Sequence, residues 1–151
     1  MTTERTEAGT ALTELVMAVF RLNGELLEAA EGMAGPVGLT AARWQVLGPI
    51  MQDAKTVSAI GREMGLARQS VQRLAHVLVD EGVVEYLDNP ADRRAKLLSL
   101  TKEGRSALRR VGERQHKWAN ATSDGTQASQ YRTCVATLTA LSARIAKGLQ
   151  G

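Results

Sequence analysis

Residues 57–82 read VSAIGREMGLARQSVQRLAHVLVDEG, and this stretch decides the fold. Ser58 is a good N-cap residue for a short helix, and Gly65 permits the sharp turn that follows it. A longer helix is predicted from about residue 67 to residue 81, with Gly82 as its C-terminal stop. Its apolar positions recur at helical spacing and are Val71, Leu74, Ala75 and Leu78. Two helices joined by a tight turn form a helix–turn–helix unit.

The spacing of apolar residues along the sequence changes directly after this unit. Residues 83–87 and 96–100 are short strand-like runs, and the polar cluster 88–92 between them is typical of a turn. Two short strands around a polar turn make a β-hairpin. A short helix, a tight turn, a longer helix and a hairpin are together the pattern of a winged helix–turn–helix. The predicted fold class is therefore mainly α with a small β-hairpin wing.

More helices are predicted on both sides of this lobe. Apolar residues at helical spacing indicate helices over 11–31 and 41–51, and Pro49 is expected to kink the second one or end it early. Two further helices are predicted over 102–119 and 126–149. The expected N-caps of the helices at 41 and 102 are Thr40 and Thr101.

The composition fits a helical protein that can bind an anionic partner. Hydrophobic residues make up 44% of the 151 residues and aromatics only 3%, which favours a Leu, Val, Ala and Ile core over a β-sandwich. The formal net charge is +3. It divides into −4 over residues 1–38, +4 over 39–110 and +3 over 111–151. The positive charge therefore lies in the middle and at the C-terminal end, which permits an anionic partner without establishing one.

Several classes of protein are disfavoured by what the sequence lacks. The single cysteine, Cys134, excludes an intramolecular disulfide, and no apolar run reaches the ~18 residues of a membrane span. With no signal-peptide pattern at the start, we expect a cytoplasmic protein without a membrane partner. His76 and His116 lack neighbouring ligands at metal-binding spacing, so no metal or cofactor is expected. No catalytic constellation is visible, so enzymatic activity is not expected.

The helix predicted over 67–81 carries a polar face suited to DNA. Arg can bridge guanine N7 and O6, and Gln can pair with adenine in the major groove, whereas Ser can bond a phosphate. The alternative is a solvated helix face, but such faces usually mix both signs of charge, and residues 67–79 contain no acid. The candidate contacts are Arg68, Gln69, Ser70, Gln72 and Arg73.

The hairpin turn supplies a second candidate contact at Asp92, Arg93 and Arg94. An arginine at a wing tip can enter the minor groove, where the potential is most negative over A·T-rich DNA. Phosphates would repel Asp92, so its expected role is to orient a neighbouring arginine by a salt bridge. The alternative reading is an ordinary charged loop.

These residues resemble the MarR family (multiple-antibiotic-resistance regulators). The matching motifs run from about Leu39 to Gly104, and the helix order extends the resemblance over nearly the whole chain. The most specific motifs are Asp-x-Arg in the wing at 92–94 and Leu-Thr-x-x-Gly at 100–104, where the next helix begins. The other matching stretches are Leu39–Leu47, Thr56–Ser58, Gly65–Val71, Leu78–Val84 and Asn89–Lys96.

The resemblance implies a transcriptional regulator, most often a repressor, that binds a pseudo-palindromic operator in double-stranded DNA as a homodimer. It implies that residues 1–38 and 102–151 form a helical dimerisation region around a DNA-binding lobe at 39–101. It also implies release by a small phenolic or other lipophilic ligand, or by thiol oxidation. It assigns the predicted helix contacts to DNA recognition, with Arg94 as the wing arginine held by Asp92.

Three positions depart from the family pattern. Ala67 stands where a Ser or Thr cap is usual, a loss of about 1 kcal/mol that phosphate binding at the helix start can offset. Gly61 stands where Ala is usual and weakens its helix unless close packing requires it. Cys134 lies in the last helix, whereas the family's peroxide sensors carry their cysteine in the first, so a thiol switch is disfavoured.

A small-molecule pocket has weaker candidates. Met17, Phe20 and Trp44 could line one between the dimer helices and the DNA-binding lobe, although plain core packing is the alternative for each. Two other functions remain open, a winged-helix module that binds protein and a small-molecule-binding protein that does not bind DNA. The protein-binding module predicts acids on the helix at 67–81 and no wing arginine, and the sequence meets neither expectation.

Overall fold

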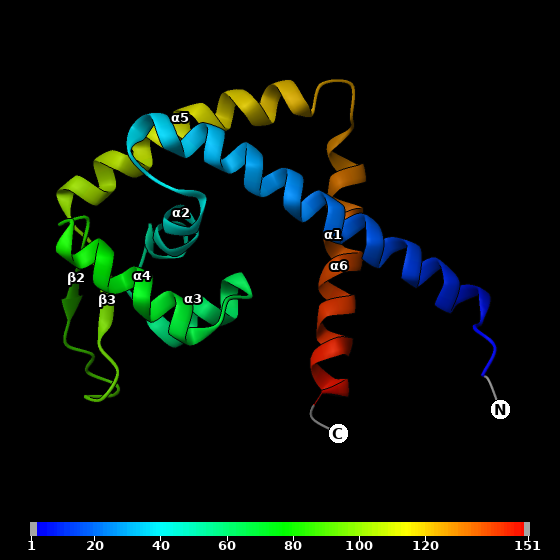
Figure 1. Ribbon diagram of the computed structural model, residues 1–151, viewed down its shortest axis with the longest axis horizontal. Coiled ribbons are helices and arrows are strands. Elements are labelled where there is room, and N and C mark those ends of the chain that lie inside the picture. The colour runs from blue at the N-terminus through cyan, green and yellow to red at the C-terminus, as the bar shows by residue number, and fades with distance from the viewer. Residues whose placement is uncertain (1–2, 150–151) are drawn as a thin grey trace. The chain divides into compact units, whose positions relative to one another are not determined.

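The computed structural model describes residues 3–149, with eleven helical and strand elements in the order drawn in Figure 1. The chain separates into two compact units, residues 1–114 and 115–151. The boundary between them falls inside helix α5 (Lys102–Thr122). Mostly helical structure with one small antiparallel sheet confirms the predicted fold class.

Helix α1 (Glu7–Ala34) is longer at both ends than the predicted 11–31. Its N-cap is Thr6, whose hydroxyl accepts a hydrogen bond from the Gly9 amide at 3.0 Å. The helix continues past Gly32 because Met33 and Ala34 are buried, and packing outweighs the low helix propensity of glycine. A 3₁₀ turn, η1 (Gly35–Val37), then ends in the left-handed Gly38.

Helix α2 (Ala41–Leu47) begins at the expected N-cap, because the Thr40 hydroxyl accepts from the Arg43 amide at 3.1 Å. Glu31 of α1 supplies a second acceptor, and its Oε1 lies 2.8 Å from the Ala41 nitrogen. The α-helix gives way at Gly48 to the 3₁₀ turn η2 (Gly48–Ile50). Pro49 lies at the start of that turn, where its missing N–H costs no helical bond, so the early ending that it predicted is confirmed.

Helices α3 (Val57–Met64) and α4 (Arg68–Asp80) form the predicted helix–turn–helix. The N-cap of α3 is Thr56, whose hydroxyl accepts from the Ala59 amide at 3.1 Å, so the prediction of Ser58 was wrong. Gly65 adopts the left-handed φ of 66° that the turn needs. A Cβ at Gly61 would lie 2.8 Å from the Leu66 carbonyl oxygen, which explains glycine at this position.

The hairpin belongs to a three-stranded antiparallel sheet with the order β1-β3-β2. Strands β2 (Val84–Leu87) and β3 (Leu97–Leu100) form the wing, with Tyr86 paired to Leu98. The unpredicted strand β1 (Lys55–Thr56) pairs along the free edge of β3. Two residues are too few to show alternation, so the sequence carries no signal for this strand.

The core lies among α2, α3, α4, the sheet and the first half of α5. Within residues 3–149 no polar or charged side chain is buried, so the core rests on apolar packing alone. The fully buried large side chains are Val46, Leu47, Ile50, Ile60, Val71, Leu78, Val84, Leu98 and Val111.

One junction joins four elements of this unit. The Thr101 hydroxyl donates to the Gly82 carbonyl at 2.6 Å and accepts from the Gly104 amide at 3.1 Å, so it caps α5 as expected. The Thr101 amide donates to the Val83 carbonyl at 3.2 Å. Gly104 is buried against that same carbonyl oxygen, and a Cβ there would overlap it. The end of α4, the start of β2, the end of β3 and the start of α5 therefore meet at one point.

The second unit contains the end of α5 and helix α6 (Ala128–Gly148). At the start of α6 the Gln127 amide donates to the Gln130 side-chain oxygen at 3.1 Å, and the helix as described buries no residue. Its exposed large apolar side chains are Tyr131, Val135, Leu138 and Ile145. Among the described residues no helix combines the length and the apolar character that a membrane span requires.

We expect Gly104→Ala to lower the free energy of unfolding by about 1–3 kcal/mol, because the new methyl group has no space beside the Val83 carbonyl. Gly112→Ala is the matched control on the same helix, since nothing lies within 4 Å of its added Cβ. That change should be neutral or stabilise by up to about 1 kcal/mol. Urea unfolding of both variants checks this, and equal effects would contradict the packing account.

Candidate nucleic-acid interface

Helix α4 turns its predicted contact residues outward. Val71, Ala75 and Leu78 are buried and hold one side of the helix against the core. On the other side Arg68, Gln69 and Arg73 are exposed, whereas Ser70 and Gln72 are half-buried. The five predicted residues thus lie on the first two turns of α4, and all five are at least partly accessible to a partner.

The first turn of α4 lacks a side-chain cap. Ala67 occupies the N-cap position with φ −64° and ψ 136°, the extended conformation that a capping residue adopts, but it has no hydroxyl or carboxylate to accept a backbone N–H. The first turn also contains no acidic residue. Free N–H groups at a helix start attract anions, so this end of α4 suits a phosphate oxygen.

The wing tip is held by local bonds around Asp92. Its Oδ1 accepts from the Arg94 backbone amide at 2.9 Å and forms an ion pair with Arg94 Nε at 3.6 Å. The salt bridge expected between Asp92 and a neighbouring arginine is therefore present. The Arg94 side chain is 94% exposed, so most of it extends into solvent, and Arg93 is exposed beside it. Asn89 Oδ1 accepts from the Ala91 amide at 3.1 Å and closes the turn.

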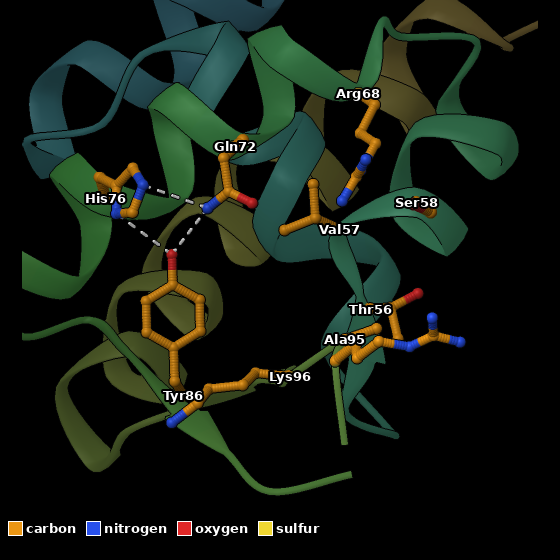
Figure 2. A pocket seen from close by; sticks show the side chains of 10 residues that line it. Thr56, Val57, Ser58, Arg68, Gln72, His76, Tyr86, Ala95 and Lys96 are labelled. Atoms are coloured by element: carbon orange, nitrogen blue, oxygen red, sulfur yellow. Dashed lines mark hydrogen bonds between the residues drawn. The ribbon is translucent and has the colours of Figure 1, made fainter. Parts of the chain in front are cut away.

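The two predicted contact elements meet around one hollow of about 380 Å³ (Figure 2). Residues of β1, α3, α4 and the wing line it, and none of them is acidic. Its cationic side chains are Arg68, Arg94 and Lys96. The remaining lining residues are Thr56, Val57, Ser58, Gln72, His76, Tyr86 and Ala95. Arg68 and Arg94, which lie far apart in sequence, thus border the same positively charged concave surface.

Of the acids near this hollow, Asp92 and Asp88 pair with two of its cations, Arg94 at 3.6 Å and Lys96 at 3.9 Å, and two others are paired elsewhere. Glu63 pairs with Lys55 at 2.6 Å, and Glu81 pairs with Arg43 at 2.9 Å. Within residues 3–149, Arg68 and Arg73 form no ion pair. Because no carboxylate neutralises these two guanidinium groups, their charge remains available to an anionic partner.

A side-chain cluster of Gln72, His76 and Tyr86 links α4 to β2, and sequence reasoning missed it. Gln72 Nε2 donates to the Tyr86 hydroxyl at 3.0 Å and lies 3.3 Å from His76 Nε2, while His76 Nδ1 lies 3.3 Å from the same hydroxyl (Figure 2). The two rings meet edge to face, with centroids 6.1 Å apart. The i,i+4 spacing of Gln72 and His76 was the available signal, but only the register of β2 brings Tyr86 to them.

The three residues predicted for a ligand pocket occupy different surroundings. Met17 and Phe20 of α1 are 62% and 70% exposed, so the alternative of core packing within the chain is wrong for both. Trp44 is half-buried and lines a hollow of about 300 Å³ whose lining includes neither of them. The other residues of that hollow are Gln45, Gly48, Pro49, Glu63 and Met64.

Potential metal ligands and the single cysteine also have defined surroundings in the structure. Over residues 3–149 no three His, Cys, Asp or Glu side chains come together in a group that could hold a metal ion. Cys134 lies exposed on α6.

Comparison with known proteins gives consistent matches. A family model described as MarR family matches residues 37–95. A Mycobacterium tuberculosis protein described as uncharacterized is 42% identical over 103 residues, which are 68% of this chain and 72% of that protein.

Solved structures share the fold. The M. tuberculosis transcriptional regulator MOSR in complex with DNA is similar with a TM-score of 0.71 and 23% identity, over 86% of this chain and 96% of that one. CouR from Rhodococcus jostii bound to p-coumaroyl-CoA is similar with a TM-score of 0.76 and 24% identity, over 84% and 90%. The winged helix–turn–helix found here is thus the fold of these regulators.

We expect Ala67→Ser to raise the free energy of unfolding by about 0.5–2 kcal/mol, because a serine hydroxyl at this position can accept an unbonded N–H of the first turn. Ala121→Ser, near the end of α5, adds the same hydroxyl where no N-cap is missing and should not stabilise. Thermal unfolding of both variants makes the comparison. An unchanged stability in Ala67→Ser would show that the first turn is already satisfied.

Proposed function

This chain belongs to the MarR family of transcription regulators, and from that premise we propose that it binds double-stranded DNA sequence-specifically as a homodimer and represses transcription. One observation supports the proposal most strongly. The first two turns of α4 and the wing border a hollow that carries Arg68, Arg94 and Lys96 and no acid. Such a surface complements the phosphate backbone on both sides of a groove.

The proposed contacts divide into two kinds. Helix α4 enters the major groove, where Arg68, Gln69 and Gln72 reach base edges, while Ser70, Arg73 and the uncapped helix start contact phosphates. The wing follows the backbone to the adjacent minor groove, where Arg94 and Arg93 extend toward the strong negative potential. Asp92 contacts no DNA in this arrangement but limits the directions that the Arg94 side chain can take.

Apolar side chains that are exposed to solvent in the single chain support the homodimer. Seven large apolar residues of α1 are exposed, and most of them lie on the side of the helix opposite Glu14, Glu25 and Glu28. A contiguous apolar surface of this kind marks an interface in a protein of this size. The residues concerned are Leu12, Met17, Val19, Phe20, Leu22, Leu26 and Leu27. A two-fold dimer would place two α4 helices about 34–36 Å apart on a pseudo-palindromic operator.

We further propose that a small lipophilic or phenolic ligand controls DNA binding. The similar structure of CouR holds p-coumaroyl-CoA. In this chain Trp44 lines an apolar hollow, and Met17 and Phe20 are exposed on a helix that contacts α2 through the Glu31–Ala41 hydrogen bond. A ligand at the dimer helices could therefore shift α2 and, with it, the DNA-binding lobe.

We expect Arg68→Ala to weaken binding to a selected operator by about 1–3 kcal/mol and to weaken binding to random DNA less, because a guanidinium that bridges a base adds sequence discrimination. Arg132→Ala on α6 removes the same charge from the other unit and is the control. Fluorescence anisotropy at several salt concentrations measures both effects. Wild-type binding that does not weaken with salt would refute the DNA-binding proposal, since phosphate contacts release counterions.

We expect Phe20→Glu to shift the equilibrium from dimer to monomer by about tenfold or more, because an unpaired carboxylate would be buried in the proposed interface. Arg21→Glu adds an acid one residue along, on the polar side of α1, and should leave the dimer intact. Sedimentation velocity over a concentration series tests both. A wild-type chain that stays monomeric at high concentration would contradict the homodimer.

A further inference from the structure

The side-chain amide nitrogen of Gln72 contacts two other side chains, those of Tyr86 and His76. This nitrogen donates to the Tyr86 hydroxyl at 3.0 Å and lies 3.3 Å from His76 Nε2, whereas the amide oxygen points away from both (Figure 2). Gln72 lines the hollow beside the wing and also a second one of about 460 Å³ on the outer side of α4. This residue therefore stands in the middle of the candidate DNA face with one of its two polar atoms already engaged.

With the amide nitrogen of Gln72 facing both groups, as the structure places it, one assignment of hydrogen atoms satisfies this cluster. An amide nitrogen carries two hydrogens and accepts none, so both Tyr86 Oη and His76 Nε2 must act as acceptors toward it. Because His76 Nε2 accepts, the hydrogen of the neutral ring is on Nδ1, which donates to Tyr86 Oη across 3.3 Å. The cluster uses both amide hydrogens of Gln72 and leaves the amide oxygen without a partner inside it.

We infer that Tyr86 and His76 are positioning residues that make Gln72 a hydrogen-bond acceptor at the DNA surface. This inference rests on the proposed DNA-binding function. A glutamine whose oxygen and nitrogen are both free can pair with adenine through two hydrogen bonds, to N6 and N7. With its nitrogen held, Gln72 offers only an oxygen, which bonds the exocyclic amino group of adenine N6 or cytosine N4.

The consequence is a specific and unusual base preference. At the position that Gln72 reads, adenine and cytosine should both be accepted on the contacted strand. Guanine and thymine should be rejected, because each places a keto oxygen opposite the amide oxygen of Gln72. The preference would thus follow the amino or keto character of the base and not its identity as adenine.

The test is site selection from random DNA with the full-length chain, followed by anisotropy on operators that differ at the selected positions. In the wild type we expect one position per half-site to prefer amino-bearing over keto-bearing bases by about tenfold. Gln72→Ala should abolish that preference. Tyr86→Phe removes only the hydroxyl that holds the amide, and it should reduce the preference by about fivefold.

Two comparisons separate positioning from a structural effect. Ser99→Ala removes a hydroxyl from the neighbouring strand and is the control, since Ser99 pairs with Glu85 and so lies on the other face of the sheet from Tyr86. It should leave the base preference intact. In the Gln72→Ala background, Tyr86→Phe should have no further effect on preference, because its action passes through Gln72.

Three results would overturn the inference while leaving DNA binding standing. They are a wild-type preference for adenine alone, a preference that Gln72→Ala does not change, and a Tyr86→Phe effect that persists without Gln72. If the wild type shows no salt-sensitive binding to any DNA, the proposed function and this inference fall together. Circular dichroism of each variant confirms that a lost preference does not reflect lost folding.

Discussion

The contact between Gly104 and the Val83 carbonyl oxygen sets the geometry on which the winged helix–turn–helix depends. The backbone of α5 approaches the start of β2 so closely that no side chain fits between them. Thr101 reinforces the approach through hydrogen bonds to Gly82, Val83 and Gly104. Since α4 ends and β2 begins at this junction, the junction determines the angle between the wing and α4. The shape of the hollow between α4 and the wing depends on that angle.

The separation of an apolar core from a charged surface explains how this lobe can carry several exposed arginine side chains. Within residues 3–149 the core contains no buried polar or charged side chain, so folding does not depend on electrostatic pairs. The ion pairs that exist lie at the surface and contribute little stability. Arg68, Arg73 and Arg94 can therefore be arranged for a partner without a large cost to the fold.

The sequence predicted those features that local chemistry determines. The caps at Thr40 and Thr101, the turn at Gly65 and the Asp92–Arg94 pair each depend on residues close along the chain, and each is present. The N-cap of α3 was misplaced because Thr56 and Ser58 are both good caps two residues apart, and only the helix geometry chooses between them. The cluster around Gln72 could not be predicted, because it depends on how β2 is placed beside α4. The same limit applies to Met17, Phe20 and Trp44, whose surroundings are set by tertiary packing.

The missing cap at Ala67 also affects how α4 moves. In the free chain the N–H groups of its first turn have only water as an acceptor, so this turn is the end of α4 most prone to fraying. An oxyanion that accepts these hydrogens would close the turn, and occupancy of the surface would then be coupled to local order in the helix. Amide hydrogen exchange at residues 68–70 would therefore report on binding. The segment that binds the oxyanion would also be the one whose ordering costs part of the binding energy.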